Sequence, residues 1–96
     1  MPLSDLFRRK KSDPEMERRT RLLQGGRITE GVIIDIGNDD SGAIRQIYFH
    51  YEVSGVDYES SQLLSDEQRL REIDYAPGAR VTIRYDPQRP GNSVVV

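Results

Sequence analysis

The stretch IRQIYFHYEVSGVDYESS, residues 44–61, decides the fold of this chain. Its first ten residues alternate between apolar and polar side chains, which is the period-two pattern of a β-strand with one buried face. The apolar members of that alternation are Ile47, Phe49, Tyr51 and Val53. The pattern therefore predicts a strand that presents its large apolar residues to a core.

The pair Ser54-Gly55 interrupts the alternation and predicts a turn into a second strand. If these two residues are the whole loop, both strands present their apolar members to the same side. The opposing pairs are then Val53 with Val56, Tyr51 with Tyr58, and Phe49 with Ser60. A longer turn with Gly55 in a bulge would shift the register by one residue, so both registers stay open.

Outward from this hairpin, similar alternation bounded by turn-forming residues predicts five strands in all. Their ranges are Arg27–Gly37, Ile44–Val53, Val56–Ser61, Arg80–Tyr85 and Ser93–Val96, and the predicted core holds Phe49, Tyr51, Tyr58, Val81 and Ile83. Glu30-Gly31 predicts a kink or bulge in the long first strand. A rigid double turn is predicted before the last strand, between Asp86-Pro87 and Pro90-Gly91.

A helix is predicted ahead of the strands, over Pro14–Gln24. Ser12 and Asp13 are candidate caps at its start, and Gly25-Gly26 ends it. Its apolar stripe is thin, which indicates a helix that leans on the body of the protein rather than forming its centre.

A short helix between the third and fourth strands decides the architecture. Ser65 has capping-box spacing to Gln68, and Leu70 with Ile73 forms a small apolar edge. The resulting order predicts a mostly β fold: a small five-stranded antiparallel barrel, like the oligonucleotide/oligosaccharide-binding (OB) barrel. An SH3-like barrel and an open sheet covered by one helix are the alternatives. The predicted division is a basic arm and helix over residues 1–26 and a barrel over residues 27–96.

Charge is distributed unevenly between these two parts. The net charge is -2, but residues 1–27 hold eight basic and four acidic side chains, so this segment is positive and the rest is negative. The basic run that ends the arm is Arg8, Arg9, Lys10 and Lys11. Such an arm is typical of segments that contact anionic partners.

The composition excludes several classes of protein. The chain has no cysteine, which removes disulfides, thiolate metal sites and cysteine nucleophiles. It also has no apolar run long enough to span a membrane and no secretory signal, so we expect a cytoplasmic location, peripheral to a membrane where the arm contacts one.

The single histidine, His50, offers little for catalysis. In the register above it faces Glu59, and Glu52 faces Asp57, so these four side chains are the candidate ligands for a divalent ion. A solvated polar sheet face is the preferred interpretation. We therefore predict no catalytic residues, no metal site and no cofactor.

Two stretches together resemble a known bacterial family. They are the strand Ile47–Val53 and the block PGARVTIRYDPQRPGNS, residues 77–93. With Gly26–Val32 and Gly55–Tyr58 they are similar to the domain-of-unknown-function family 3592 over roughly the last seventy residues. The resemblance implies no reaction or ligand. Many relatives carry flanking membrane-spanning helices, whereas this flank is a basic arm.

These observations favour a non-catalytic interaction module. Its basic arm, residues 8–11, is predicted to contact an anionic membrane surface or a protein partner. The alternative is weak, non-specific binding of single-stranded nucleic acid through the same arm. The acidic residues near Tyr48 and His50 argue against nucleic-acid binding by the barrel face.

Overall fold

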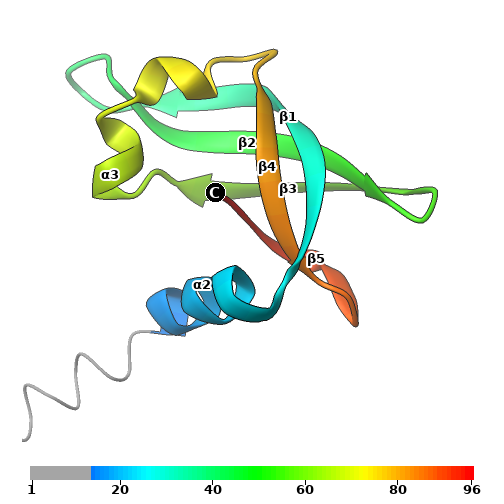
Figure 1. Cartoon of the computed structure of the whole chain (residues 1–96). Helices are drawn as coiled ribbons and strands as arrows, with labels where there is room; N and C mark the ends of the chain where they lie inside the picture. The colour runs from blue at the N-terminus through cyan, green and yellow to red at the C-terminus, as the bar shows by residue number, and fades with distance from the viewer. Residues whose placement is uncertain (1–13) are drawn as a thin grey trace, which may run out of the picture.

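The protein is a single five-stranded antiparallel sheet rolled into a nearly closed barrel, described here for residues 14–96 of a computed structural model (Figure 1). The elements follow in the order α2 (Pro14–Gly25), β1 (Arg27–Asn38), β2 (Ile44–Val53), β3 (Val56–Leu63), α3 (Asp66–Arg69), the 3-10 helix η1 (Glu72–Tyr75), β4 (Arg80–Asp86) and β5 (Arg89–Val95). The strand order is β3-β2-β1-β4-β5. This barrel, with its helix between the third and fourth strands, has the predicted OB-like arrangement, and the open-sheet alternative is wrong.

The β2–β3 hairpin has the predicted register with the two-residue turn. Val53 pairs with Val56, Tyr51 with Tyr58, and Phe49 with Ser60. Ser54 and Gly55 both have positive φ, 53° and 82°, as the commonest hairpin turn requires. The alternative register with a longer turn is therefore wrong.

Strand β1 lies between β2 and β4 and pairs with both. Gly31 is paired regularly with both β2 and β4, and a β-bulge lies between Ile33 and Asp35. The first strand therefore has the predicted irregularity, but the predicted position at Glu30-Gly31 is wrong. A side chain at residue 31 would place its Cβ against Cδ1 of Ile83 and 2.6 Å from the carbonyl oxygen of His50, so it would clash with both. Glycine is thus required there for close approach rather than for a kink.

The core fills the inside of the barrel. Ile47, Phe49 and Ile83 have no exposed surface, and Tyr51 is 1% exposed. The rings of Phe49 and Tyr51 stack with centroids 5.9 Å apart, and those of Tyr51 and Tyr58 with centroids 5.5 Å apart. Of the five predicted core residues only Tyr58 is partly exposed, and it packs against the buried cluster.

The two edge strands, β3 and β5, approach each other along a line that we call the seam. The buried side-chain amide of Gln62 accepts a hydrogen bond from the Val95 backbone N–H at 2.8 Å and donates one to the Val95 carbonyl oxygen at 3.3 Å. Gln68 donates to the same carbonyl oxygen at 2.9 Å, and the Tyr51 hydroxyl donates to the carbonyl oxygen of Pro90. Side chains therefore satisfy backbone groups of β5 that an open edge would leave to water.

The last strand begins earlier than predicted. The β4–β5 turn consists of Pro87 and Gln88 alone, and β5 runs from Arg89, so Pro90-Gly91 belongs to the strand and not to a second turn. A proline lacks the backbone N–H of a ladder, but it is tolerated on an edge strand. β3 likewise extends two residues beyond its predicted end, to Leu63.

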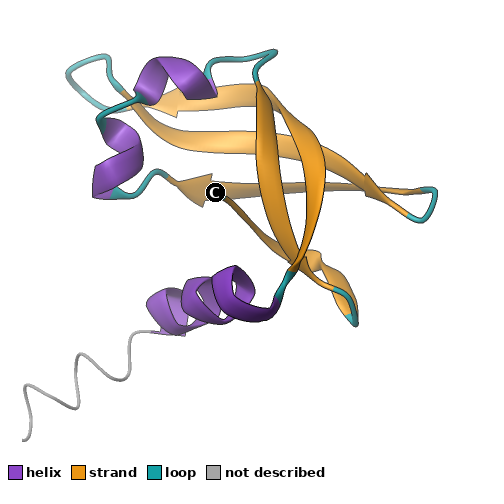
Figure 2. Ribbon diagram, viewed as in Figure 1, coloured by secondary structure: helices purple, strands orange, loops and turns teal. Residues whose placement is uncertain are grey.

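The helices lie at the periphery of the barrel (Figure 2). Helix α2 packs against β4 and β5 through one buried residue, Leu22, while Met16 and Leu23 are exposed. Gly26 N–H closes the helix on the Leu22 carbonyl oxygen, and Arg84 donates to the Gly26 carbonyl oxygen at 3.0 Å. The prediction of a leaning helix is confirmed.

The α3–η1 segment has the predicted capping box but not the predicted apolar edge. Ser65 accepts a hydrogen bond from the backbone N–H of Gln68 at 3.2 Å, and the Gln68 side chain accepts one from Ser65 N–H at 3.0 Å. Leu70 and Ile73, however, are 86% and 81% exposed. The reason is the backbone of Arg71, at φ −127° and ψ 37°, which separates α3 from η1 and removes the helical spacing.

Candidate functional site

The four candidate metal ligands are brought to one sheet face, but they do not form a metal site. His50 lies opposite Glu59 and Glu52 lies opposite Asp57, as predicted. His50 Nε2 instead lies 3.1 Å from Oδ1 of its diagonal neighbour Asp57, in an exposed pair. Within residues 14–96, no three His, Cys, Asp or Glu side chains are grouped so that they could hold a metal ion.

The predicted partner-binding residues Arg8, Arg9, Lys10 and Lys11 lie outside the described residues. The described chain begins at Pro14, the first residue of α2 (Figure 1).

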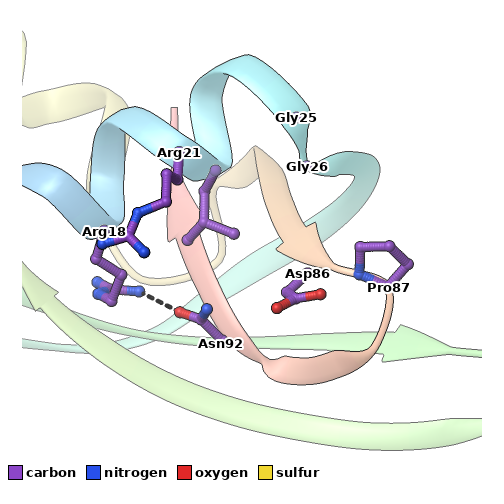
Figure 3. A pocket seen from close by; sticks show the side chains of 8 residues that line it. Arg18, Arg21, Gly25, Gly26, Asp86, Pro87 and Asn92 are labelled. Carbon is purple, nitrogen blue, oxygen red and sulfur yellow. Dashed lines mark hydrogen bonds between the residues drawn. The ribbon is translucent and has the colours of Figure 1, made fainter.

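A pocket of about 270 Å³ lies between the end of α2 and the β4–β5 hairpin (Figure 3). Arg18 is already engaged there: it donates to Oδ1 of Asn92 at 2.8 Å and to the carbonyl oxygen of Ser93 at 3.0 Å, and it pairs with Glu15. Asp86 accepts a hydrogen bond from Gln88 N–H. Arg18 and Asn92 therefore hold α2 to the hairpin, whereas Asp86 is engaged within the β4–β5 turn.

A second hollow lies on the outer face of β1, β2 and β3, and we call it the sheet groove. It measures about 490 Å³ and is lined by Ile34, Asp35, Tyr48, Glu59, Ser60 and Ser61. Tyr48 is 37% exposed and Ile34 is 45% exposed. Two large apolar groups thus lie in the open on a face that is otherwise polar.

The β-bulge in β1 builds one wall of the sheet groove. Because the pairing skips one residue between Ile33 and Asp35, Ile34 and Asp35 are both exposed, whereas a regular strand would direct one of them inward. Asp35 of β1 pairs with Tyr48 of β2, and Tyr48 pairs in turn with Ser61 of β3. These three side chains form one transverse row on the outer face, with Glu59 diagonal to Tyr48.

The sheet groove carries negative charge without an internal cation. Asp35 accepts one hydrogen bond, from the backbone N–H of Ile36 at 2.8 Å. Neither Glu59 nor Tyr48 has a side-chain hydrogen bond to any other described residue. The sequence did not indicate this site, because no pattern in it places the bulge that exposes Ile34 beside Asp35.

A third hollow, of about 380 Å³, separates α2 from α3. Its exposed apolar side chains are Met16, Leu23 and Val96, and Arg19 and Arg71 also line it. The Arg19 guanidinium donates to the Leu63 carbonyl oxygen at 3.4 Å.

Within residues 14–96, no helix has both the length and the apolar character to cross a membrane.

Comparison with known proteins assigns the barrel to a family. The family model described as Domain of unknown function (DUF3592) matches residues 25–96. No curated protein and no solved structure matches the chain. The matched segment begins at the last residue of α2 and contains all five strands, the seam and the sheet groove. The chain therefore belongs to the DUF3592 family over most of its length.

Proposed function

We propose that this protein is a non-catalytic interaction module whose basic arm, Arg8–Lys11, holds it to an anionic partner, a membrane surface or an acidic protein. The observation that carries the proposal is the separation of charge. Four consecutive cations lie just ahead of α2, while the barrel face holds Asp35, Glu52, Asp57 and Glu59.

Helix α2 extends the positive end of the molecule. It carries Arg18, Arg19 and Arg21, and Arg21 has no hydrogen bond or ion pair to another described residue. The arm and α2 together therefore present cations at one end of the chain. The barrel supplies the rigid body to which they are attached.

A non-catalytic role is supported by the chemistry of the side chains. The chain has one histidine and no cysteine, and that histidine lies on an open sheet face beside Asp57. General acid–base or nucleophilic catalysis needs a base placed against a reacting group in a site that excludes water. The sheet groove is open to solvent, so its carboxylates do not lie in a site that excludes water.

The expected attachment is weak and reversible. A basic residue near an anionic bilayer contributes about 1 kcal/mol, so four contribute about 4 kcal/mol. The attachment weakens as salt rises, because the screening length falls to about 8 Å at physiological ionic strength.

Vesicle co-sedimentation of the full chain tests the membrane form of this proposal. We expect binding to anionic vesicles at low salt and none to neutral vesicles. A variant with Arg8, Arg9, Lys10 and Lys11 all changed to Gln keeps the length and apolar residues of the arm and should lose the binding. If this variant binds anionic vesicles as the wild type does, the arm is not the membrane-contacting element. Binding to a single-stranded oligonucleotide with a steep salt dependence would favour the nucleic-acid alternative instead.

A further inference from the structure

We infer that the sheet groove of one copy binds the basic arm, Arg8–Lys11, of a second copy. This inference rests on the proposed function, because it takes the arm as the contacting element and names its acidic protein partner. The site is then shared between copies: one supplies the cations and the other supplies the groove.

The floor of the sheet groove suits a long cationic side chain. The Tyr48 ring lies in the open, and a guanidinium or ammonium group is attracted to such a ring when it lies within about 6 Å of the ring centre. Ile34 beside it provides an apolar surface for the methylene stem of lysine or arginine. A basic side chain can therefore bury its stem and keep its charge at the rim.

The walls of the sheet groove suit the charge. Asp35 and Glu59 flank Tyr48, and the Glu59 carboxylate has no cation or donor among residues 14–96. Glu52 and Asp57 continue the negative face along β2 and β3. Phosphate groups would be repelled from this surface, whereas a run of four cations is complementary to it.

A second copy is the source of the arm that the architecture favours. Only Ser12 and Asp13 separate Lys11 from α2, so its backbone lies within about 10 Å of the first residue of that helix. Helix α2 packs against β4 and β5 (Figure 1), whereas the residues that line the sheet groove belong to β1, β2 and β3. Helix α2, to which the arm is joined, therefore packs mainly against strands other than the three that line the groove.

Sedimentation velocity of the full chain over a concentration series at low salt tests the inference. We expect a reversible association that is lost at high salt. The groove variant, Tyr48→Ser with Glu59→Gln, and the arm variant, with residues 8–11 changed to Gln, should each stay monomeric. The matched control, Leu70→Ser with Asp74→Asn, changes one exposed apolar and one exposed acidic residue away from the sheet groove and should associate as the wild type does.

Mixing the two defective chains separates contact between copies from contact within one copy. The arm variant still has an intact groove, and the groove variant still has an intact arm, so the mixture should associate although neither chain does alone. Absence of association in the mixture, when the wild type associates, would overturn the assignment to a second copy. Circular dichroism of each variant checks that the fold is retained.

The remaining outcomes distinguish the inference from the proposed function. If the wild-type chain stays monomeric yet binds anionic vesicles through its arm, the inference is wrong and the proposed function is retained. If the groove variant still associates but the arm variant does not, the inference is likewise wrong and the proposed function is retained. Association that survives in the arm variant overturns the inference, and only vesicle binding that also survives in that variant removes the membrane form of the proposed function.

Discussion

The interior of the barrel and its seam are held by different kinds of contact. Inside, Ile47, Phe49 and Ile83 are fully buried, and burial of apolar surface is favourable whatever the direction of approach. At the seam, Gln62 must place one oxygen and one nitrogen on the two backbone groups of Val95. The interior therefore tolerates many apolar sequences, whereas the seam requires particular polar side chains in a fixed geometry.

This difference predicts how each region responds to substitution. Loss of an interior side chain should cost its transfer free energy and leave a cavity. Loss of a seam side chain should cost the desolvation of the groups it leaves unpaired. The following substitutions test that contrast, in order of decreasing effect.

Phe49→Ala should produce the largest loss of stability. Truncation of a buried phenylalanine costs about 3–5 kcal/mol, which is a large part of the stability of a small domain. The neighbouring Tyr48→Ala is the control, because Tyr48 lies on the outer face. Thermal and chemical denaturation measure both. A larger loss for Tyr48→Ala than for Phe49→Ala would mean that the faces of β2 are assigned the wrong way round.

Gln62→Ala should have an intermediate effect. It leaves the backbone N–H of buried Val95 without its partner, at a cost of about 1–3 kcal/mol, whereas the Val95 carbonyl oxygen keeps its hydrogen bond from Gln68. Gln46→Ala is the matched control, since Gln46 has no side-chain hydrogen bond among the described residues. Chemical denaturation should show a loss for the first variant and little change for the second. A neutral Gln62→Ala would mean that the seam is not held by this amide.

Tyr51→Phe should have a smaller effect that depends on pH. Removal of its hydrogen bond to the Pro90 carbonyl oxygen costs about 1 kcal/mol near neutral pH. Burial raises the pKa of Tyr51 above its usual value of 10.0. The folded state therefore keeps the proton at a pH where the unfolded chain loses it, and stability falls as the pH rises above about 10.

Denaturation at pH 8 and at pH 11 checks this sign. The wild type should lose more stability between the two values than Tyr51→Phe does, because the variant lacks the group that titrates. A larger loss in the variant would contradict the assigned direction of the pKa shift.

Asp39→Asn should have the smallest effect, since it lies in the exposed β1–β2 turn. The Asp39 carboxylate accepts hydrogen bonds from the Ser41 hydroxyl and from the backbone N–H groups of Ser41 and Ala43. These bonds, led by that from the Ser41 hydroxyl, lower the pKa of Asp39 below 3.8. Its stabilisation is therefore present above that pH and is lost as the pH falls below it. Denaturation at pH 6 and pH 3 should show that the variant loses less stability than the wild type; an equal loss would remove this role.

The sequence predicted the interior because two independent patterns agree there. Alternation along residues 44–53 fixes the buried face, and Ser54-Gly55 fixes the turn, so the register follows from both. The Ser65 capping box was predictable for the same reason, because both of its partners lie within one short segment.

The sequence did not predict the seam or the sheet groove, because their causes are not local. The pair Pro90-Gly91 has the composition of a turn. It lies in a strand instead, and the Tyr51 hydroxyl that binds the Pro90 carbonyl oxygen is 39 residues away in the sequence. The groove depends on a bulge at Ile34 that the paired strand determines. Of the site, only the opposition of His50 to Glu59 and of Glu52 to Asp57 could be derived beforehand.

The seam also affects how the protein moves. Because the Gln62, Gln68 and Tyr51 side chains hold β5 beside β3, these strands can separate along that line while the four backbone ladders stay intact. Such local opening requires less free energy than global unfolding. Amide-proton exchange at Val95 would then follow the rotation of a glutamine side chain rather than the unfolding of the domain.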